Sequence, residues 1–282
     1  MSMKRTDQAQ SFLPEDFGKL LDLVVQEKSV AAKVSTLFST NKEKAAFPLW
    51  VASPTPSWLD ELEDIPLTDG DTDEVVVEPK KTISLTLISN ELADDSDPDV
   101  AQQIAVAAAN KLVASIDSAF FNDGSNAKAP AGLLSLVDGS SNPKYQEVDP
   151  GTALTNLDPF IEARYAAQEQ NASLTHWLVT PATAEALSKL KIASGSNQSL
   201  IQFVEDGITV AGLPVVTSTH VDAASTAWGV DKTQLRYVLR QGSTVEKFDS
   251  VTNDGLYVRA KSRIGFGFLN PAGVVRIWHD AS

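Results

Sequence analysis

The longest stretch with helical periodicity runs from Pro98 to Phe121. Its apolar residues recur three and four positions apart, so they fall on one stripe of a helix. They are Val100, Ile104, Ala107, Ala108, Leu112, Ile116, Ala119 and Phe120. Asp97 is a suitable N-cap, and Pro98 suits the first helical position because its missing N–H needs no partner there. The pattern predicts a helix on the order of 35 Å long, with its stripe packed on the strand expected near residues 257–268.

Alternating apolar and polar residues predict long strands on either side of this helix. Ile83, Leu85 and Leu87 alternate with hydroxyl side chains in a strand expected over residues 75–89. A second strand is expected over residues 257–264. The cations that its alternation places on one face are Arg259, Lys261 and Arg263. Residues 274–278 form the last predicted strand.

A compact α/β pattern separates these strands and follows a Ser-, Asn-, Pro- and Gly-rich junction at residues 139–151. Helices are predicted to start at Asp158 and at Pro181, with a buried strand at 177–179 between them. Residues 208–217 predict two strands around Gly212. The chain as a whole therefore reads as α+β.

Residues 41–79 have strand-like pieces but no apolar stripe long enough for a core of their own. Trp50 and Trp58 occur there among several prolines. Large apolar side chains without a local core usually mark an interface. We therefore expect this arm to lie on a neighbouring subunit, the alternative being that it folds back on its own domain.

Composition narrows the function. The chain has 282 residues, a formal net charge of -14 and no cysteine. This acidic balance argues against tight nucleic-acid binding through phosphate contacts, although a container that encloses DNA is compatible with it. The lack of cysteine excludes disulfides and thiolate metal sites. Neither an apolar signal segment nor a membrane span is present in the sequence.

Enzymatic motifs are absent, and we predict no catalytic, metal or cofactor site. The three histidines lack partners at metal-ligand spacing. Gly265 and Gly267 superficially resemble a dinucleotide fingerprint, but they are better explained as positions where bulky neighbours pack against a strand. Asp69–Asp73 resembles the start of a calcium loop without its glycine and glutamate, so an acidic turn is favoured over a weak cation site shared between subunits.

The order of several short motifs resembles the major capsid proteins of tailed bacteriophages, which share the Hong Kong 97-type shell fold. The resemblance spans nearly the whole chain, and it depends on the order and spacing of motifs that are individually weak. They are Trp58–Glu61 with Ile65-Pro66, Pro79–Lys81, Ile88–Ser96, Asp117–Phe121, Pro130–Leu134, Trp177–Pro181, Ala211–Val215, Arg259–Arg263 and Asn270–Ala272.

The resemblance implies four parts: an N-terminal arm (1–36), an extended β-hairpin loop (37–90), a peripheral domain with a long spine helix (91–145 and 255–282) and an axial α/β domain (146–254). It implies a non-enzymatic protein that self-assembles into pentamers and hexamers of an icosahedral head shell enclosing double-stranded DNA. The implied partners are other copies of the chain, a portal, and a separate scaffold or cement protein. The implied location is the virion capsid, assembled in the host cytoplasm without a membrane.

Two departures from the family refine this expectation. The sequence reaches the arm almost at once after Met1, so no fused scaffolding segment is expected. Some relatives form Lys–Asn cross-links from a lysine in the extended loop, whereas residues 45–79 contain no lysine. We therefore expect a non-covalent shell.

A subunit interface is the predicted functional site. We expect the loop acids Glu61, Glu63 and Asp64 to meet the basic strand of an adjacent subunit, with Trp50 and Trp58 as apolar anchors. The cations of that strand are Arg259, Lys261 and Arg263. The alternative is that these cations face solvent or packaged DNA. Two other functions remain open: an encapsulin-like nanocompartment shell, and a soluble α+β binding protein or hydrolase.

Overall fold

The computed structural model describes residues 27–52, 58, 71–89, 99–137, 142–152, 154–192, 197–204, 207–240, 244–250 and 255–279. The helices of these residues are α2 (Val30–Lys33), α4 (Asp99–Phe120), α5 (Asp158–Glu169) and α6 (Pro181–Lys189), with 3-10 turns η1 (Leu133–Ser135) and η2 (Pro271–Gly273). Three sheets accompany them. The predicted α+β class is confirmed.

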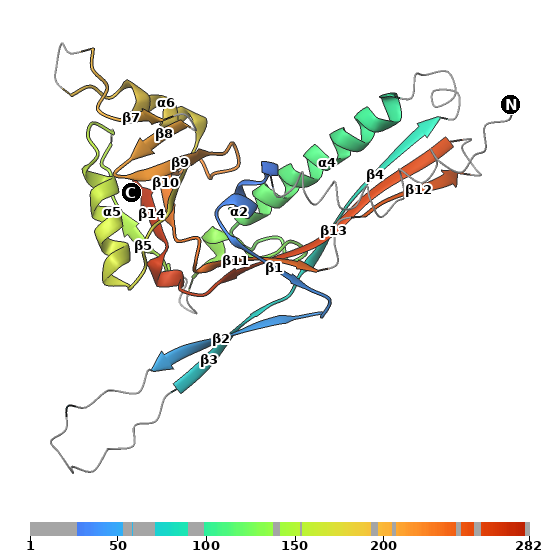
Figure 1. The fold of residues 1–282 in the computed structure, drawn as a ribbon, viewed down its shortest axis with the longest axis horizontal. Helices are drawn as coiled ribbons and strands as arrows, with labels where there is room; N and C mark the ends of the chain where they lie inside the picture. The colour runs from blue at the N-terminus through green and yellow to red at the C-terminus, as the bar shows by residue number, and fades with distance from the viewer. Residues whose placement is uncertain are drawn as a thin grey trace, which may run out of the picture.

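A five-stranded sheet forms the long axis of the molecule, and β13 is its central strand (Figure 1). β13 pairs with β4 along one edge and with β11 and then β12 along the other, while β1 pairs with β11 in parallel. The bounds are β1 (Thr36–Thr40), β4 (Lys80–Ser89), β11 (Leu235–Arg240), β12 (Thr244–Ser250) and β13 (Gly255–Phe268).

Helix α4 lies along one face of this sheet, as its apolar stripe predicts (Figure 1). Its residues Leu112, Ile116 and Phe120 are almost completely buried. The Phe120 ring contacts Phe266 at 5.1 Å and Phe268 at 6.3 Å between ring centroids. The predicted packing of this helix on the strand at 257–268 is therefore confirmed for the stripe from Ala108 to Phe120, whereas Ala107 is exposed.

A buried carboxylate fixes the segment before β1 to the same helix. Asp117 of α4 accepts hydrogen bonds from the Ser29 hydroxyl at 2.6 Å and from the backbone N–H groups of Ala31 and Val30 at 3.1 and 3.2 Å. Because these donors belong to the first turn of α2, the aspartate satisfies N–H groups that a short helix leaves unpaired.

A seven-stranded sheet forms the compact part of the molecule, in the order β5-β14-β10-β6-β9-β8-β7. The core on one of its faces includes Phe160 of α5, Leu187 of α6 and Trp177 of β6. Its strands are β5 (Gln146–Val148), β6 (His176–Val179), β7 (Gln202–Val204), β8 (Gly207–Val210), β9 (Leu213–Thr217), β10 (Ser225–Val230) and β14 (Val275–Trp278).

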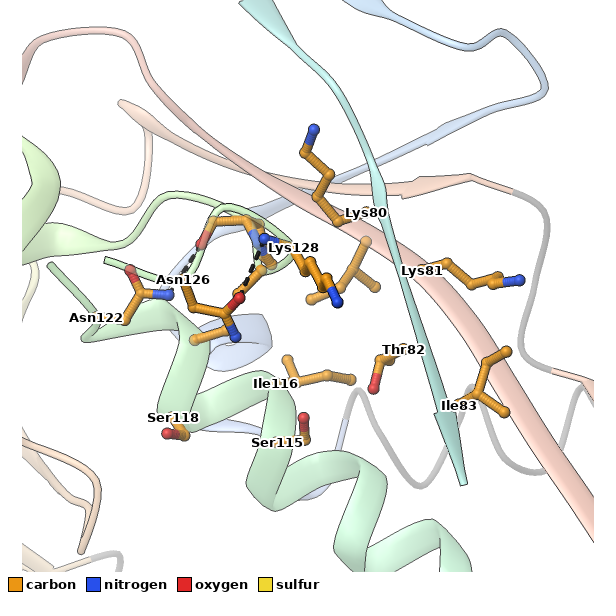
Figure 2. A pocket seen from close by; sticks show the side chains of 14 residues that line it. Lys80, Lys81, Thr82, Ile83, Ser115, Ile116, Ser118, Asn122, Asn126 and Lys128 are labelled. Atoms are coloured by element: carbon orange, nitrogen blue, oxygen red, sulfur yellow. Dashed lines mark hydrogen bonds between the residues drawn. The ribbon is translucent and has the colours of Figure 1, made fainter. Parts of the chain in front are cut away.

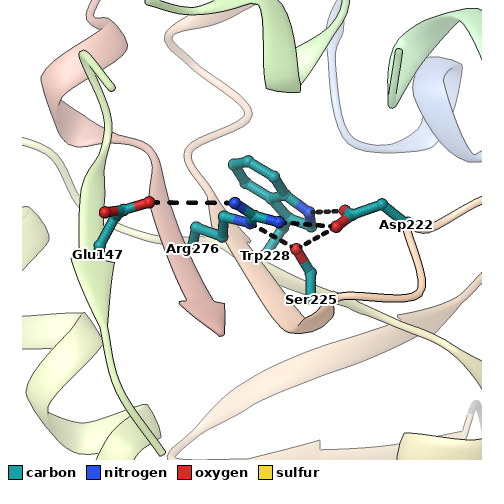
Figure 3. A network of polar contacts seen from close by, with 5 residues as sticks. All are labelled: Glu147, Asp222, Ser225, Trp228 and Arg276. Atoms are coloured by element: carbon teal, nitrogen blue, oxygen red, sulfur yellow. Dashed lines mark hydrogen bonds and ion pairs between the residues drawn. The ribbon is translucent and has the colours of Figure 1, made fainter. Parts of the chain in front are cut away.

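A polar network attaches the last strand to this sheet (Figure 3). Arg276 of β14 donates to the Ser225 hydroxyl at 2.7 Å and to the Asp222 carboxylate at 2.9 Å. Asp222 also accepts a hydrogen bond from the Trp228 indole N–H at 2.9 Å. The Glu147 carboxylate lies 4.0 Å from Nη1 of Arg276. Since Arg276 is only 8% exposed, these acceptors compensate the loss of water around its charge.

A two-stranded ribbon, β2 (Ala45–Ala52) with β3 (Asp71–Val77), projects away from the body (Figure 1). Its root packs on β11 through Val77 and Val238. A Cβ atom on Gly265 or Gly267 would lie 2.6 or 2.9 Å from a methyl carbon of Val77. These two glycines therefore provide space for the ribbon root, and the interpretation of Gly265 and Gly267 as packing positions is confirmed.

Strand pairing distributes the chain differently from the predicted four parts. β11 and β12 belong to the long sheet although they lie within residues 146–254, and β14 belongs to the seven-stranded sheet although it lies within residues 255–282. The division into arm, loop, peripheral and axial parts stays a prediction.

Candidate subunit interface

The long sheet leaves one face uncovered by α4, and its predicted basic residues lie there. On β13, Val258, Ala260 and Ile264 are buried on the helix side. Arg259, Lys261 and Arg263 alternate with them and therefore point to the opposite side. We call the surface formed on that side by β12, β13 and β4 the outer sheet face.

Strand β4 adds exposed apolar side chains to the outer sheet face. Its residues Ile83, Leu85 and Leu87 are 46%, 59% and 44% exposed. In Figure 2 Thr82 lies on the helix side of the strand, whereas Ile83 points away from α4. The strand thus presents its hydroxyl residues to the helix and its aliphatic residues to the outside, which is the reverse of burial in a single subunit.

One acid on the neighbouring strand pairs with two of the three predicted cations. Glu246 of β12 accepts a hydrogen bond from Arg259 Nε at 3.0 Å and forms an ion pair with Lys261 Nζ at 2.5 Å. Lys261, with Arg259, holds the pKa of Glu246 below its usual range. The Arg259 guanidinium also lies 4.6 Å from the centre of the Phe248 ring, a cation–π contact.

Arg263 has a different environment, beside a cation that sequence reasoning missed. In the antiparallel pairing of β13 with β4, Arg263 is directly opposite Lys81. The part of the chain that the structure describes shows no ion pair for either side chain. Both line a pocket of about 270 Å³ on the outer sheet face, together with Thr244. The Lys81 charge was visible in the sequence, but its register with Arg263 was not.

The predicted aromatic anchors are only partly described. Trp58 is completely exposed. Trp50 lies in β2 opposite Thr72, and its side chain is outside the described residues. The predicted loop acids Glu61, Glu63 and Asp64 also lie outside them. The proposed contact between these acids and the outer sheet face therefore stays a prediction.

The acidic turn at residues 69–73 lies only partly within the described residues. Asp73 is in β3, where its carboxylate accepts the backbone N–H of Glu74 at 2.7 Å. Among the described residues, no group of three or more His, Cys, Asp or Glu side chains could hold a metal ion. No described helix is both long and apolar enough to cross a membrane.

A second pocket, of about 430 Å³, lies between α4, β4 and the loop at residues 122–130 (Figure 2). Its polar lining includes Lys128, Asn122 and Asn126, and the two amides are used by the loop itself. Asn122 donates to the Pro130 carbonyl at 3.2 Å, and Asn126 accepts from the Lys128 backbone at 3.1 Å. These contacts stabilise the turn after the helix.

Comparison with known proteins identifies the family. A model of the Phage capsid family matches residues 10–277. The chain belongs to this family. It is thus a capsid shell protein whose place is the virion capsid, in a family of structural proteins. The recognition made from the ordered motifs is confirmed, and a search of curated proteins finds no match.

Solved structures confirm the shell fold of this capsid protein. A chain from Mycobacterium phage Bobi matches with a TM-score of 0.71 at 16% identity, covering 90% of this chain and 91% of that one. The capsid of an empty GTA particle computed with C5 symmetry matches with a TM-score of 0.73 at 18% identity, covering 88% of this chain and 89% of that one. A chain from Microbacterium phage Oxtober96 matches with a TM-score of 0.73 at 14% identity, covering 89% of this chain and 91% of that one.

Proposed function

We propose that this chain is a major capsid protein that assembles into the pentamers and hexamers of an icosahedral head shell around double-stranded DNA. The observation that carries the proposal is the outer sheet face, where Ile83, Leu85 and Leu87 are exposed beside a row of cations. A contiguous apolar surface with charged neighbours is typical of a protein interface. Family membership supplies the kind of assembly in which that interface would be used.

Charge supports enclosure of DNA without sequence readout. The net charge of -14 disfavours extensive phosphate contact, so the genome would be confined with its counterions. The further partners in this proposal are a portal and a separate scaffold or cement protein, with assembly in the host cytoplasm. The shell would have no catalytic role.

The contact that closes the shell would join the hairpin loop of one subunit to the outer sheet face of the next. Residues 45–79 carry acids and no lysine or arginine, including Glu61, Glu63 and Asp64. Among the described residues, the outer sheet face has four cations and one acid, Glu246. Trp50 and the exposed Trp58 would add apolar area. Individual surface ion pairs contribute only ~0–1 kcal/mol, but each subunit of a shell repeats the contact.

Electron microscopy of the purified protein tests the assembly. We expect closed icosahedral particles for the wild-type protein, whereas Arg263→Glu should reduce particle yield and salt resistance. Arg263→Lys keeps the charge and serves as the matched control. Particles of unchanged yield with Arg263→Glu would rule out the loop contact, and a monomeric wild type would rule out the shell. Protein cargo in place of DNA would favour the encapsulin-like alternative.

A further inference from the structure

Two positively charged side chains lie next to each other on the outer sheet face, and no described acid lies between them. Lys81 and Arg263 are direct cross-strand partners in the pairing of β4 with β13. Side chains on the same face at directly opposite positions have Cβ atoms only ~5 Å apart, and like charges there destabilise a sheet. The repulsion would be relieved if an anion lay between the two side chains.

The subunit does not supply that anion from its described residues. Glu246 is the acid of this face, and it is already engaged by Arg259 and Lys261. Glu78, which lies just before β4, is also engaged, because it forms ion pairs with Lys80 and Lys44. Lys81 and Arg263 therefore share the pocket on the outer sheet face without a described carboxylate, and Lys81 also lines the pocket beside α4.

A hydroxyl group in the same pocket also has no hydrogen-bond partner among the residues that the structure describes. Thr244 of β12 is opposite Lys261 in the strand pairing, and it lines the pocket with Lys81 and Arg263. Its Oγ1 atom is buried and has no hydrogen-bond partner among the described residues. A buried hydroxyl without a partner is costly, so a ligand that accepts its hydrogen bond would recover that cost.

We propose that Lys81, Arg263 and Thr244 form a carboxylate-binding site that takes an acid of residues 60–64 from a second copy of the chain. The site deepens the proposed function and rests on it. Residues 60–64 contain four carboxylates and no cation, which makes them electrostatically complementary to the site. An arginine can hold a carboxylate through two parallel hydrogen bonds, and the lysine and hydroxyl supply further donors.

A second copy is the source because the ribbon that leads to these residues starts at its contact with Gly265 and Gly267 and extends away from the part of the long sheet that contains β12 (Figure 1). Strands β2 and β3 leave the body near Val77 and extend to the side opposite the free ends of β12 and β13. The cations of one subunit are thus placed to receive the loop of another.

If the site exists, loss of the Lys81 charge should change the stability of the isolated subunit and the yield of particles in opposite directions. Lys81→Gln removes a repulsion from the isolated subunit, so its melting temperature should stay the same or rise. The same substitution removes a ligand for the carboxylate, so particle yield should fall. A purely structural role would lower both. Lys80→Gln is the matched control, because Lys80 is on the opposite side of β4 and contacts Glu78.

A peptide measurement separates this site from the shell itself. A fluorescent peptide of residues 56–66 is titrated into dispersed subunits, and a second peptide with its acids replaced by amides is the ligand control. We expect the acidic peptide to bind, and Lys81→Gln or Arg263→Gln to raise its Kd by about tenfold or more. Thr244→Val should weaken binding less, without lowering the melting temperature.

Each other outcome has a definite meaning. The site is wrong if the acidic peptide does not bind, if the amide peptide binds equally well, or if Lys81→Gln leaves the Kd unchanged. Displacement of the peptide by a short DNA duplex would make phosphate the ligand and also overturn the site. Peptide binding by a wild type that forms no particles would support the site and contradict the proposed shell.

Discussion

At the residue scale, two acids stabilise the subunit through the donors and cations that they contact. Asp117 is buried and serves three donors at the start of α2. Glu246 is partly exposed and joins β12 to β13 through Arg259 and Lys261. The first acid fixes the chain that leads into β1, and the second organises the cations of the outer sheet face.

Asp117→Asn should destabilise the subunit, because the new amide group points a donor at N–H or O–H groups that need an acceptor. We expect a loss of about 1–3 kcal/mol in the free energy of unfolding, measured by denaturant titration. Protease cleavage within residues 27–35 should also become faster. The exposed Asp123→Asn is the control, and equal effects of the two substitutions would contradict this role.

Glu246 predicts an acid-sensitive part of the stability. Its pKa is lowered in the folded state by Lys261 and Arg259, so its contribution is fully present above the ordinary glutamate pKa. The contribution is lost as pH falls through the lowered value. Glu246→Gln should cost about 1 kcal/mol or less at neutral pH. Melting temperatures of the two proteins should converge in acid, and a constant gap down to low pH would refute the assignment.

At the element scale, the ribbon depends on the close approach of β3 to β13. Val77 occupies the space above Gly265 and Gly267, where a Cβ atom would clash. This contact sets the direction in which the ribbon leaves the body and, in the proposed shell, the reach of the loop toward a neighbour.

Gly265→Ala should therefore displace the ribbon root. We expect a loss of about 1–3 kcal/mol from overpacking, measured by chemical denaturation. Adding Val77→Ala removes the clashing methyl groups and should recover much of that loss in a double-mutant cycle. A Gly265→Ala protein as stable as the wild type would show that the contact is loose.

The sequence predicted where the helix and strands lie better than which face of each strand is buried. Helix α4 is helical from Asp99, the first residue described there, and ends within one residue of the predicted Phe121, because its stripe is long and regular. The alternation at Ile83, Leu85 and Leu87 predicted a strand, but a two-residue period does not say which side the helix covers. These side chains face outward, which only the sheet pairing reveals.

The site was predicted in part for a similar reason. Arg259, Lys261 and Arg263 share a face, as their spacing requires. The roles of Lys81 and Glu246 depend on strand register with β13, and Lys81 is about 180 positions away from it in the chain. No local pattern contains that register, so neither residue could be assigned from the sequence.

At the scale of the whole molecule, an elongated body with a projecting ribbon leaves much surface for neighbours (Figure 1). The family and the matched capsid structures agree with use of that surface in a shell. The predicted contacts are ionic and apolar, without a covalent bond.

Boiled particles should therefore run as a single monomer band on a denaturing gel. The reason is the absence of lysine from residues 45–79, where some relatives place the cross-linking side chain. Particles kept unheated in mild detergent are the control for intact assembly. A ladder of multimers after boiling would contradict the non-covalent shell.

The most direct test is a cryo-electron microscopy reconstruction of wild-type particles at side-chain detail. We expect five- and six-fold rings in which residues 60–64 of one subunit lie on Lys81 and Arg263 of another, with Trp58 beside the exposed aliphatic residues of β4. An outer sheet face open to solvent or facing DNA, in an otherwise closed shell, would contradict it.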